Sequence, residues 1–217
     1  MEEYLRFYGG LPKVVSEVDI DTERVEMCFV QYLPIFIPHS ADTIKDFRIP
    51  DNIAWTRPIV DRCTLDFGFQ YDRYLYLTVK KGFNINRHGW HCDGFGTDDI
   101  NYLWSDFGST QFLNVNRSIK LPRDHTKSLE VMERLSYTVD YPYENSFVEY
   151  PNNTILKLNQ SQIHRVNPAY MEKLRTFVKV SISDDKYNLE GNAHNYLLDY
   201  KWEMKERLEE RNHPVVL

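Results

Sequence analysis

The sequence has few cysteines and no long hydrophobic run. Cys28, Cys63 and Cys92 are widely spaced and form no C-x-x-C pair. This pattern is typical of reduced thiols in an intracellular protein and contains no zinc-thiolate motif. No segment approaches the roughly 18 apolar residues that a membrane-spanning helix needs, and no basic region followed by an apolar run opens the sequence. We therefore expect a cytoplasmic protein without membrane association.

The sequence also lacks the common nucleotide-binding and hydrolase motifs. It contains no G-x-G-x-x-G, no G-x-x-x-x-G-K-[ST] and no G-x-S-x-G. No block of like charges occurs, and the formal net charge of −6 argues against a protein whose main task is to grip a phosphate backbone. No internal repeat or flexible linker divides the chain, so we expect residues 1–217 to form a single domain.

Aromatic residues are abundant, at 14% of the chain, and they favour strands. A loop over the site is expected from Gly94 to Gly108, a short helical turn at 128–135 and an amphipathic helix at about 192–212. Many short strands with few helices predict a mainly β fold with flanking helices, although this pattern alone fits several kinds of sandwich. Strands are predicted from composition and alternation at 26–37, 73–79, 110–115, 153–158 and 176–182.

Two residues of metal-binding type, His91 and Asp93, lie at the end of an extended aromatic segment. Because strand side chains alternate with a period of two, both point to one side and Cys92 to the other. His164 follows about seventy residues later, after a predicted strand, and Arg175 begins the next strand region. Two imidazoles and one carboxylate form the facial triad of non-heme Fe(II) oxygenases. The same ligands suit zinc, and histidines that only hydrogen-bond within a β-sandwich are the remaining interpretation.

Three short motifs carry a resemblance to a known family. They are His91-x-Asp93, the segment Gln162-Ile163-His164-Arg165-Val166, and the segment Arg175-Thr176-Phe177-Val178. Over about residues 74–183, the chain resembles the Fe(II)/2-oxoglutarate-dependent dioxygenase superfamily. The resemblance implies a double-stranded β-helix (jelly roll, cupin-like) barrel with its core in these residues. It also implies that His91, Asp93 and His164 bind Fe(II), and that O2 and 2-oxoglutarate are cosubstrates.

The same resemblance implies that Arg175 binds the outer carboxylate of 2-oxoglutarate, a role that suits the planar guanidinium. Many members of the family carry Ser or Thr two residues later, where this chain has Phe177. Lys179 is a rival cation, because it shares a strand face with Arg175. The missing hydroxyl would then come from another residue, and the candidates are Tyr76, Thr78, Tyr102 and Thr110.

The function expected from the resemblance is oxidation of a substrate, with succinate and CO2 as co-products. A small molecule is the expected substrate and hydroxylation the expected outcome, while a nucleobase or a protein side chain stays open. The alternative is a cupin-like metal-binding barrel without redox turnover, because the same ligands hold a metal without any cosubstrate. The substitution of Phe177 for a hydroxyl residue favours that alternative.

Overall fold

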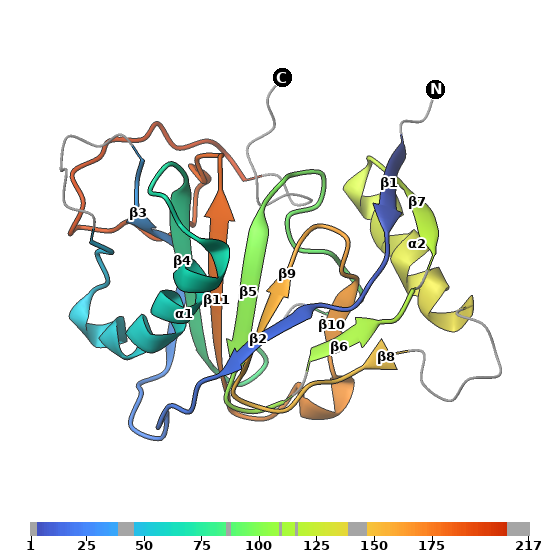
Figure 1. Ribbon diagram of the computed structural model, residues 1–217, viewed down its shortest axis with the longest axis horizontal. Helices are drawn as coiled ribbons and strands as arrows, with labels where there is room; N and C mark the ends of the chain where they lie inside the picture. Colours follow the sequence, from blue (N-terminus) through green and yellow to red (C-terminus); the bar gives the residue numbers. More distant parts are fainter. Residues whose placement is uncertain are drawn as a thin grey trace.

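Two antiparallel sheets form the fold, as seen in a computed structural model that describes residues 4–38, 46–85, 88–108, 110–115, 117–138 and 147–207. The larger sheet has the strand order β2-β9-β5-β11-β4-β3, and the smaller sheet has the order β10-β6-β8 (Figure 1). The strands of the larger sheet are β2 (Lys13–Glu17), β9 (Thr154–Leu158), β5 (Ile100–Ser105), β11 (Arg175–Ser183), β4 (Tyr74–Gly82) and β3 (Cys28–Phe36). Those of the smaller sheet are β10 (His164–Val166), β6 (Thr110–Leu113) and β8 (Phe147–Val148).

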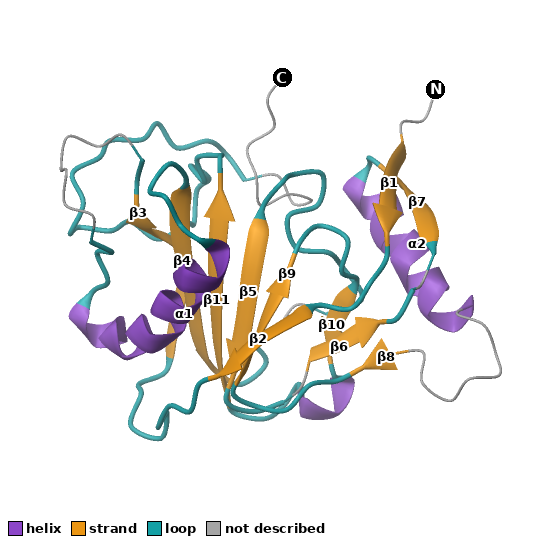
Figure 2. Ribbon diagram, viewed as in Figure 1, coloured by secondary structure: helices purple, strands orange, loops and turns teal. Residues whose placement is uncertain are grey.

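The two faces of the larger sheet differ in chemistry because side chains alternate along each strand. In β11, Val178, Val180 and Ile182 are fully buried in the main apolar cluster. That cluster also contains buried side chains of the helix α1 (Arg57–Phe67), which follows the 3-10 helix η1 (Asp51–Thr56) and covers this face (Figure 2). The opposite face of β11 carries Arg175 and Lys179 and turns towards the smaller sheet. The polar positions of β11 are therefore directed into the space between the sheets.

A smaller unit packs beside the two sheets and supports the segment around His91. It consists of β1 (Tyr4–Tyr8) paired with β7 (Ser118–Pro122) and of the helix α2 (His125–Thr138). Its apolar cluster contains Leu121 and Met132 and extends to Trp90 and Cys92. The residues on either side of His91 are thus fixed by packing. The remaining 3-10 helix is η2 (Pro168–Tyr170), between β10 and β11.

The predicted β fold with flanking helices is confirmed, and the predicted strand regions correspond to β3, β4, β6, β9 and β11. The loop predicted from Gly94 to Gly108 is wrong, because this stretch contains β5 near the middle of the larger sheet. Asn101, Leu103 and Trp104 are buried there. Polar residues on both sides of this short strand produced the error.

The amphipathic helix predicted at 192–212 is also wrong for residues 192–207, and residues 208–212 lie outside the described part of the chain. This segment is non-helical and packs across β3 and β4. Asn195 donates hydrogen bonds of 2.8 Å to the carbonyl groups of Pro34 and Arg48, and Trp202 contacts the ring of Tyr74. These tertiary contacts override the helical periodicity of the sequence. Among the described residues, no helix has the length and apolarity needed to cross a bilayer.

A partly buried carboxylate, Asp66 near the end of α1, joins the helix to the larger sheet. It accepts hydrogen bonds from Lys13 (2.6 Å), Lys157 (2.9 Å) and the hydroxyl of Tyr102 (2.9 Å). Burial raises the pKa of this carboxyl, but the hydrogen bonds outweigh burial and lower the pKa to about 2. The ionised form is therefore preferentially stabilised by folding.

Asp66→Asn is expected to lower the free energy of unfolding by roughly 2 kcal/mol at pH 7, the value of a pKa shift of this size. Because the pKa of the folded state is depressed, this stabilisation is complete above the unfolded pKa of about 3.9. It is lost as the pH falls from there towards about 2. Urea denaturation of both proteins at pH 7 and at pH 2.5 measures the difference. Equal midpoints at pH 7 would contradict the assignment.

Candidate metal centre

The backbone brings the two histidines together although they are far apart in the sequence. His91 and His164 form an antiparallel bridge in which each amide donates to the other's carbonyl, at 2.9 and 2.8 Å. His164 is the first residue of β10, an edge strand of the smaller sheet, so the bridge adds His91 beside that edge. Asp93 lies two residues beyond His91. The ligand atoms of all three residues lie within 4.8 Å of one another. Side-chain alternation predicted that His91 and Asp93 share a side, and the resemblance implied that His164 joins them.

Both imidazole rings are held in the tautomer that suits a metal. The Nδ1 atom of His91 lies 2.9 Å from the carbonyl oxygen of Gly89, and that of His164 lies 2.9 Å from the carbonyl oxygen of Gln162. A carbonyl oxygen only accepts hydrogen bonds, so each Nδ1 carries the proton and Nε2 presents its lone pair. Backbone partners of this kind fix the orientation of metal-binding histidines. The donor set therefore fits a divalent transition metal.

Asp93 supplies the third ligand as a carboxylate. Its Oδ2 atom lies 3.8 Å from Nε2 of His164 and 3.3 Å from Nζ of Lys179. Burial raises the pKa of this carboxyl, but the positive charge and hydrogen bond of Lys179 outweigh burial and hold the pKa well below its usual range. Gly94 follows with φ of +68°, and a Cβ there would lie 3.1 Å from Cβ of Asp99. A residue with a side chain would strain this turn directly after the ligand.

Cys92 is directed away from the centre, as predicted. It is buried in the apolar cluster beside α2, and its Sγ atom lies 3.9 Å from Sδ of Met132. Burial raises the pKa of the thiol, so it stays protonated at neutral pH. Cys92 is therefore a packing residue and adds no thiolate to the donor set.

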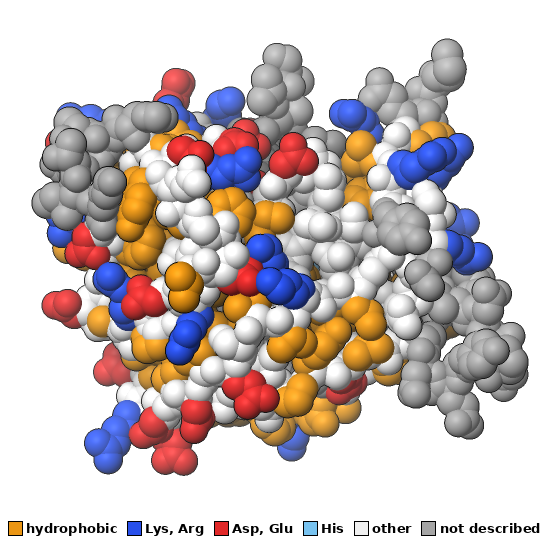
Figure 3. Space-filling view, viewed as in Figure 1, with side chains coloured by type: hydrophobic (Ala, Val, Ile, Leu, Met, Phe, Trp, Pro, Cys, Tyr) orange, Lys and Arg blue, Asp and Glu red, His pale blue; other side chains and the backbone are white. Residues whose placement is uncertain are grey.

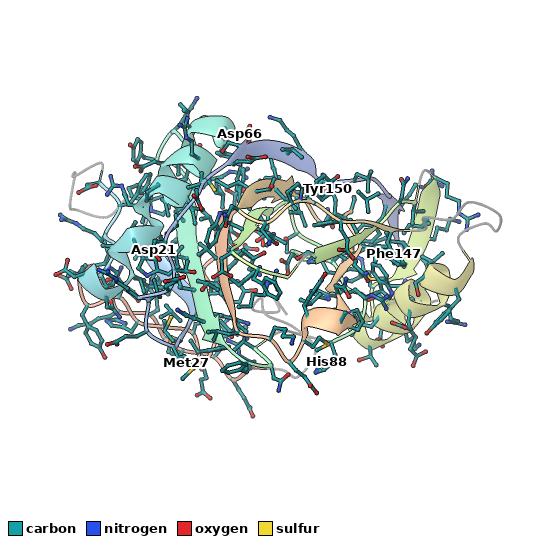
Figure 4. All side chains as sticks on the ribbon, turned by 90° about the horizontal axis from the view of Figure 1, so that it is seen from below. Asp21, Met27, Asp66, His88, Phe147 and Tyr150 are labelled. Carbon is teal, nitrogen blue, oxygen red and sulfur yellow. The ribbon has the colours of Figure 1, made fainter. Side chains whose placement is uncertain are left out.

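A cavity of about 340 Å³ lies between the two sheets and is lined in part by the triad. Figure 4 views the molecule from below and shows the two sheets on either side of this interior. Three basic side chains, Lys80, Arg175 and Lys179, line the cavity, as does the hydroxyl of Thr110. Asp93 is the one acidic residue among the described residues of the lining. This excess of positive charge suits an anionic ligand.

Arg175 contributes a buried guanidinium to the lining of this cavity. The side chain is 1% exposed, and its Nη2 atom donates to Oγ1 of Thr110 at 3.3 Å. Burial lowers the pKa to about 10, opposed by the negative charge of Asp106, so the guanidinium remains cationic at neutral pH. It lies over the ring of Phe177, 5.2 Å from the ring centre. The guanidinium is thus in contact with the ring of Phe177 on one side and the hydroxyl of Thr110 on another.

Lys179, the rival cation, is held close to the metal ligands. Its Nζ atom contacts Asp93 and donates to the hydroxyl of Tyr32 at 3.1 Å. Tyr32 has φ of +49° in an irregular part of β3, and its amide donates to Oγ1 of Thr78 at 3.0 Å. Such bulges often re-aim a side chain beside a functional site. Tyr32 and its neighbour Gln31 were missed in the sequence because no alternation pattern reveals a bulge.

Two of the predicted cosubstrate residues do not line the cavity, and these predictions are wrong. Tyr102 lies on the other face of β5, and its hydroxyl donates to Asp66. Tyr76 lies further along β4, where its ring stacks on Tyr187 with centres 4.0 Å apart and its hydroxyl donates to the carbonyl of Asp185. Both tyrosines satisfy their hydroxyl groups within the structure of the protein.

Comparison with known proteins finds only low similarity in sequence and structure. No family model and no curated protein matches the sequence. Among solved structures, EvdO2 from Micromonospora carbonacea var. aurantiaca is 14% identical with a TM-score of 0.33, and the match covers 62% of this chain and 61% of that chain. EvdO2 complexed with 2-oxoglutarate is 14% identical with a TM-score of 0.32, with 71% of this chain and 76% of that chain covered.

A full-length protein from Neurospora crassa, in complex with alpha-KG, is 14% identical with a TM-score of 0.31, and the match covers 70% of this chain and 57% of that chain. The chain thus spans about three fifths of the length of EvdO2 in its first match and of the Neurospora crassa protein. Likeness of this degree carries no weight by itself. The structure itself shows two antiparallel sheets and the convergence of His91, Asp93 and His164 between them, which is the ligand set expected from the sequence.

Proposed function

We propose that this protein is an Fe(II)- and 2-oxoglutarate-dependent oxygenase that hydroxylates a small molecule. One observation carries the proposal: one ring nitrogen from each of two histidines and a carboxylate oxygen converge within 4.8 Å, in a cavity that Arg175 also lines. Two imidazoles and one carboxylate leave further coordination positions of an iron ion for ligands other than the protein. The buried guanidinium beside them suits the second carboxylate of a dicarboxylic cosubstrate.

The side chains have distinct roles in this proposal. His91, Asp93 and His164 bind Fe(II), and Arg175 binds the outer carboxylate of 2-oxoglutarate with Thr110 beside it. Bound iron supplies the redox chemistry by which 2-oxoglutarate, O2 and a substrate C–H group become succinate, CO2 and an alcohol. The protein contributes placement, and the two sheets limit the access of water to the reacting groups.

The size of the cavity supports a small substrate. Its volume of about 340 Å³ lies at the lower end of the range for small-molecule sites, and it must hold the cosubstrate as well. On the face shown in Figure 3, acidic and basic side chains are interspersed, without a continuous basic surface. A nucleobase within a polymer is therefore a weaker candidate than a free metabolite, because nucleic-acid binding relies on extended positive charge.

The proposal is tested by measuring succinate formed from 2-oxoglutarate in the presence of Fe(II), O2 and a panel of small molecules. Turnover is expected to require both Fe(II) and 2-oxoglutarate, and the product is expected to be heavier than its substrate by one oxygen atom. Succinate released without any added substrate is measured first and gives the baseline. No succinate under any condition, from protein shown to bind iron, would contradict the proposal.

A binding module without redox turnover is the second candidate function, and the ion pair between Lys179 and Asp93 favours it. The ammonium lies 3.3 Å from Oδ2 of Asp93, so the protein neutralises this carboxylate with its own cation. Metal analysis combined with a titration of 2-oxoglutarate separates the two functions. Bound metal without affinity for 2-oxoglutarate would favour the module.

A further inference from the structure

A row of three side chains crosses the cavity face of the larger sheet next to Arg175. Lys80 on β4 pairs with Phe29 on β3 and with Phe177 on β11, so the cation lies between two aromatic residues. Directly opposed residues in neighbouring strands point to the same face. Lys80 and Phe177 both line the cavity, and Phe29 is 60% exposed at the adjoining edge strand. The row therefore runs from the interior of the cavity towards solvent.

The contacts of Lys80 differ from those of the other two cations. Its Nζ atom lies over the ring of Phe29, 4.6 Å from the ring centre. Among the residues that the structure describes, no ion pair involves Lys80. Lys179, by contrast, contacts Asp93 and Tyr32, and Arg175 donates to Thr110. Lys80 thus has no carboxylate partner among the described residues, and its nearest recorded contact is an aromatic ring.

The charge of the cavity points to a second anion besides the cosubstrate. Lys80, Arg175 and Lys179 face a single carboxylate, Asp93, among the described lining residues. A divalent metal adds two positive charges, whereas 2-oxoglutarate adds two negative ones, so the excess of positive charge persists with both bound. Burial and the charges of Lys179 and Arg175, opposed in part by the negative charge of Asp93, lower the pKa of Lys80 to about 8. An anion beside the ammonium would relieve this repulsion.

We propose that the substrate is an acid whose carboxylate or phosphate binds Lys80, with its adjoining apolar part in contact with Phe29 and Phe177. This inference rests on the proposed function and names the substrate class for it. A lysine ammonium binds either anion as a point charge, and the flanking rings provide apolar surface for the group next to it. Arg175 remains the residue for the cosubstrate, and Lys179 remains with Asp93.

The test uses the full chain loaded with Mn(II) and 2-oxoglutarate, and calorimetric titration with three probes. Phenylacetate and phenyl phosphate carry the anion next to an apolar ring, and phenylacetamide is the neutral counterpart of the former. Both anions are expected to bind the wild-type protein at least about tenfold more tightly than the amide, the value of a charged hydrogen bond. The more tightly bound anion tells whether the site prefers carboxylate or phosphate.

Three variants make the assignment specific. Lys80→Gln is expected to bind acid and amide within about twofold of each other, since the charged hydrogen bond is absent. Lys80→Arg keeps the charge and is expected to keep the preference. Lys120→Gln removes an exposed lysine of β7 and is expected to behave as wild type. Equal binding of acid and amide by the wild-type protein, or an unchanged preference in Lys80→Gln, would overturn the inference.

A separate titration with 2-oxoglutarate keeps this inference distinct from the proposed function. Lys80→Gln is expected to bind 2-oxoglutarate with wild-type affinity. A loss of that affinity would make Lys80 a cosubstrate residue and overturn the substrate assignment. If the wild-type protein itself fails to bind 2-oxoglutarate, the proposed function fails, whereas the preference for acid over amide still decides the role of Lys80.

Discussion

Asp93→Asn is expected to abolish measurable succinate release and to weaken Fe(II) binding by more than about 100-fold. Loss of a residue that only orients a ligand costs about 10- to 100-fold in metal affinity, so loss of the charged ligand itself costs more. The amide keeps the size of the side chain but removes the negative charge of the carboxylate that would bind the metal beside His91 and His164. Fe(II) affinity is measured anaerobically, and succinate release is measured with the same preparations.

The matched control is Asp98→Asn, which changes an exposed carboxylate five residues further along the same segment. It is expected to bind Fe(II) and release succinate as wild type does. Thermal unfolding of both variants separates a local effect from a loss of fold, because Lys179 loses its carboxylate partner in Asp93→Asn. A folded Asp93→Asn protein with wild-type succinate release would disprove the ligand assignment.

Arg175→Gln is expected to weaken the binding of 2-oxoglutarate by about 30-fold or more, with Fe(II) binding preserved. Removing one partner of a buried, hydrogen-bonded charge pair costs about 2–5 kcal/mol. Arg175 is 1% exposed, so water does not replace the lost contact easily. The dissociation constant of 2-oxoglutarate is measured on the Mn(II)-loaded protein, and the KM for 2-oxoglutarate is expected to rise in parallel.

Arg165→Gln is the matched control for Arg175. Its guanidinium lies 4.4 Å from the centre of the Trp90 ring and hydrogen-bonds to Gln111, outside the cavity lining. This variant is expected to keep wild-type affinity for 2-oxoglutarate. If Arg175→Gln binds 2-oxoglutarate normally and Lys179→Gln does not, the outer carboxylate binds Lys179 instead, and the assignment of Arg175 is wrong.

Two of the three residues of the triad could be predicted from the sequence, because their shared side depends on local alternation. His91 and Asp93 share a side at a spacing of two, and Cys92 takes the other side, as the structure shows. The approach of His164 requires the antiparallel bridge to His91, a long-range pairing that no spacing specifies. That part came from the resemblance to the oxygenase superfamily. The faces of β11 could likewise be predicted, since Arg175 and Lys179 both line the cavity.

The wrong predictions and the missed residues share a physical cause: contacts between residues that are far apart in the sequence. Because residues 94–108 were predicted to be a loop, no strand face could be assigned to Tyr102 from the sequence, and its ring lies in the main apolar cluster on the face of β5 away from the cavity. Tyr76 lies on the cavity face, but its partner Tyr187 fills the space beside it. Lys80 lies two residues after Thr78 in β4 and shares its strand face. This spacing could have identified Lys80 once Thr78 was known to line the cavity. The bulge that positions Tyr32 left no signal in the sequence.

The central claim is that His91, Asp93 and His164 hold one ion that also binds 2-oxoglutarate. The direct measurement is the anaerobic absorption spectrum of the protein with one equivalent of Fe(II), before and after 2-oxoglutarate is added. The account predicts a new charge-transfer band in the visible region that requires both components and is absent from Asp93→Asn. Iron binding of equal strength in wild type and Asp93→Asn, with no band in either protein, would contradict it.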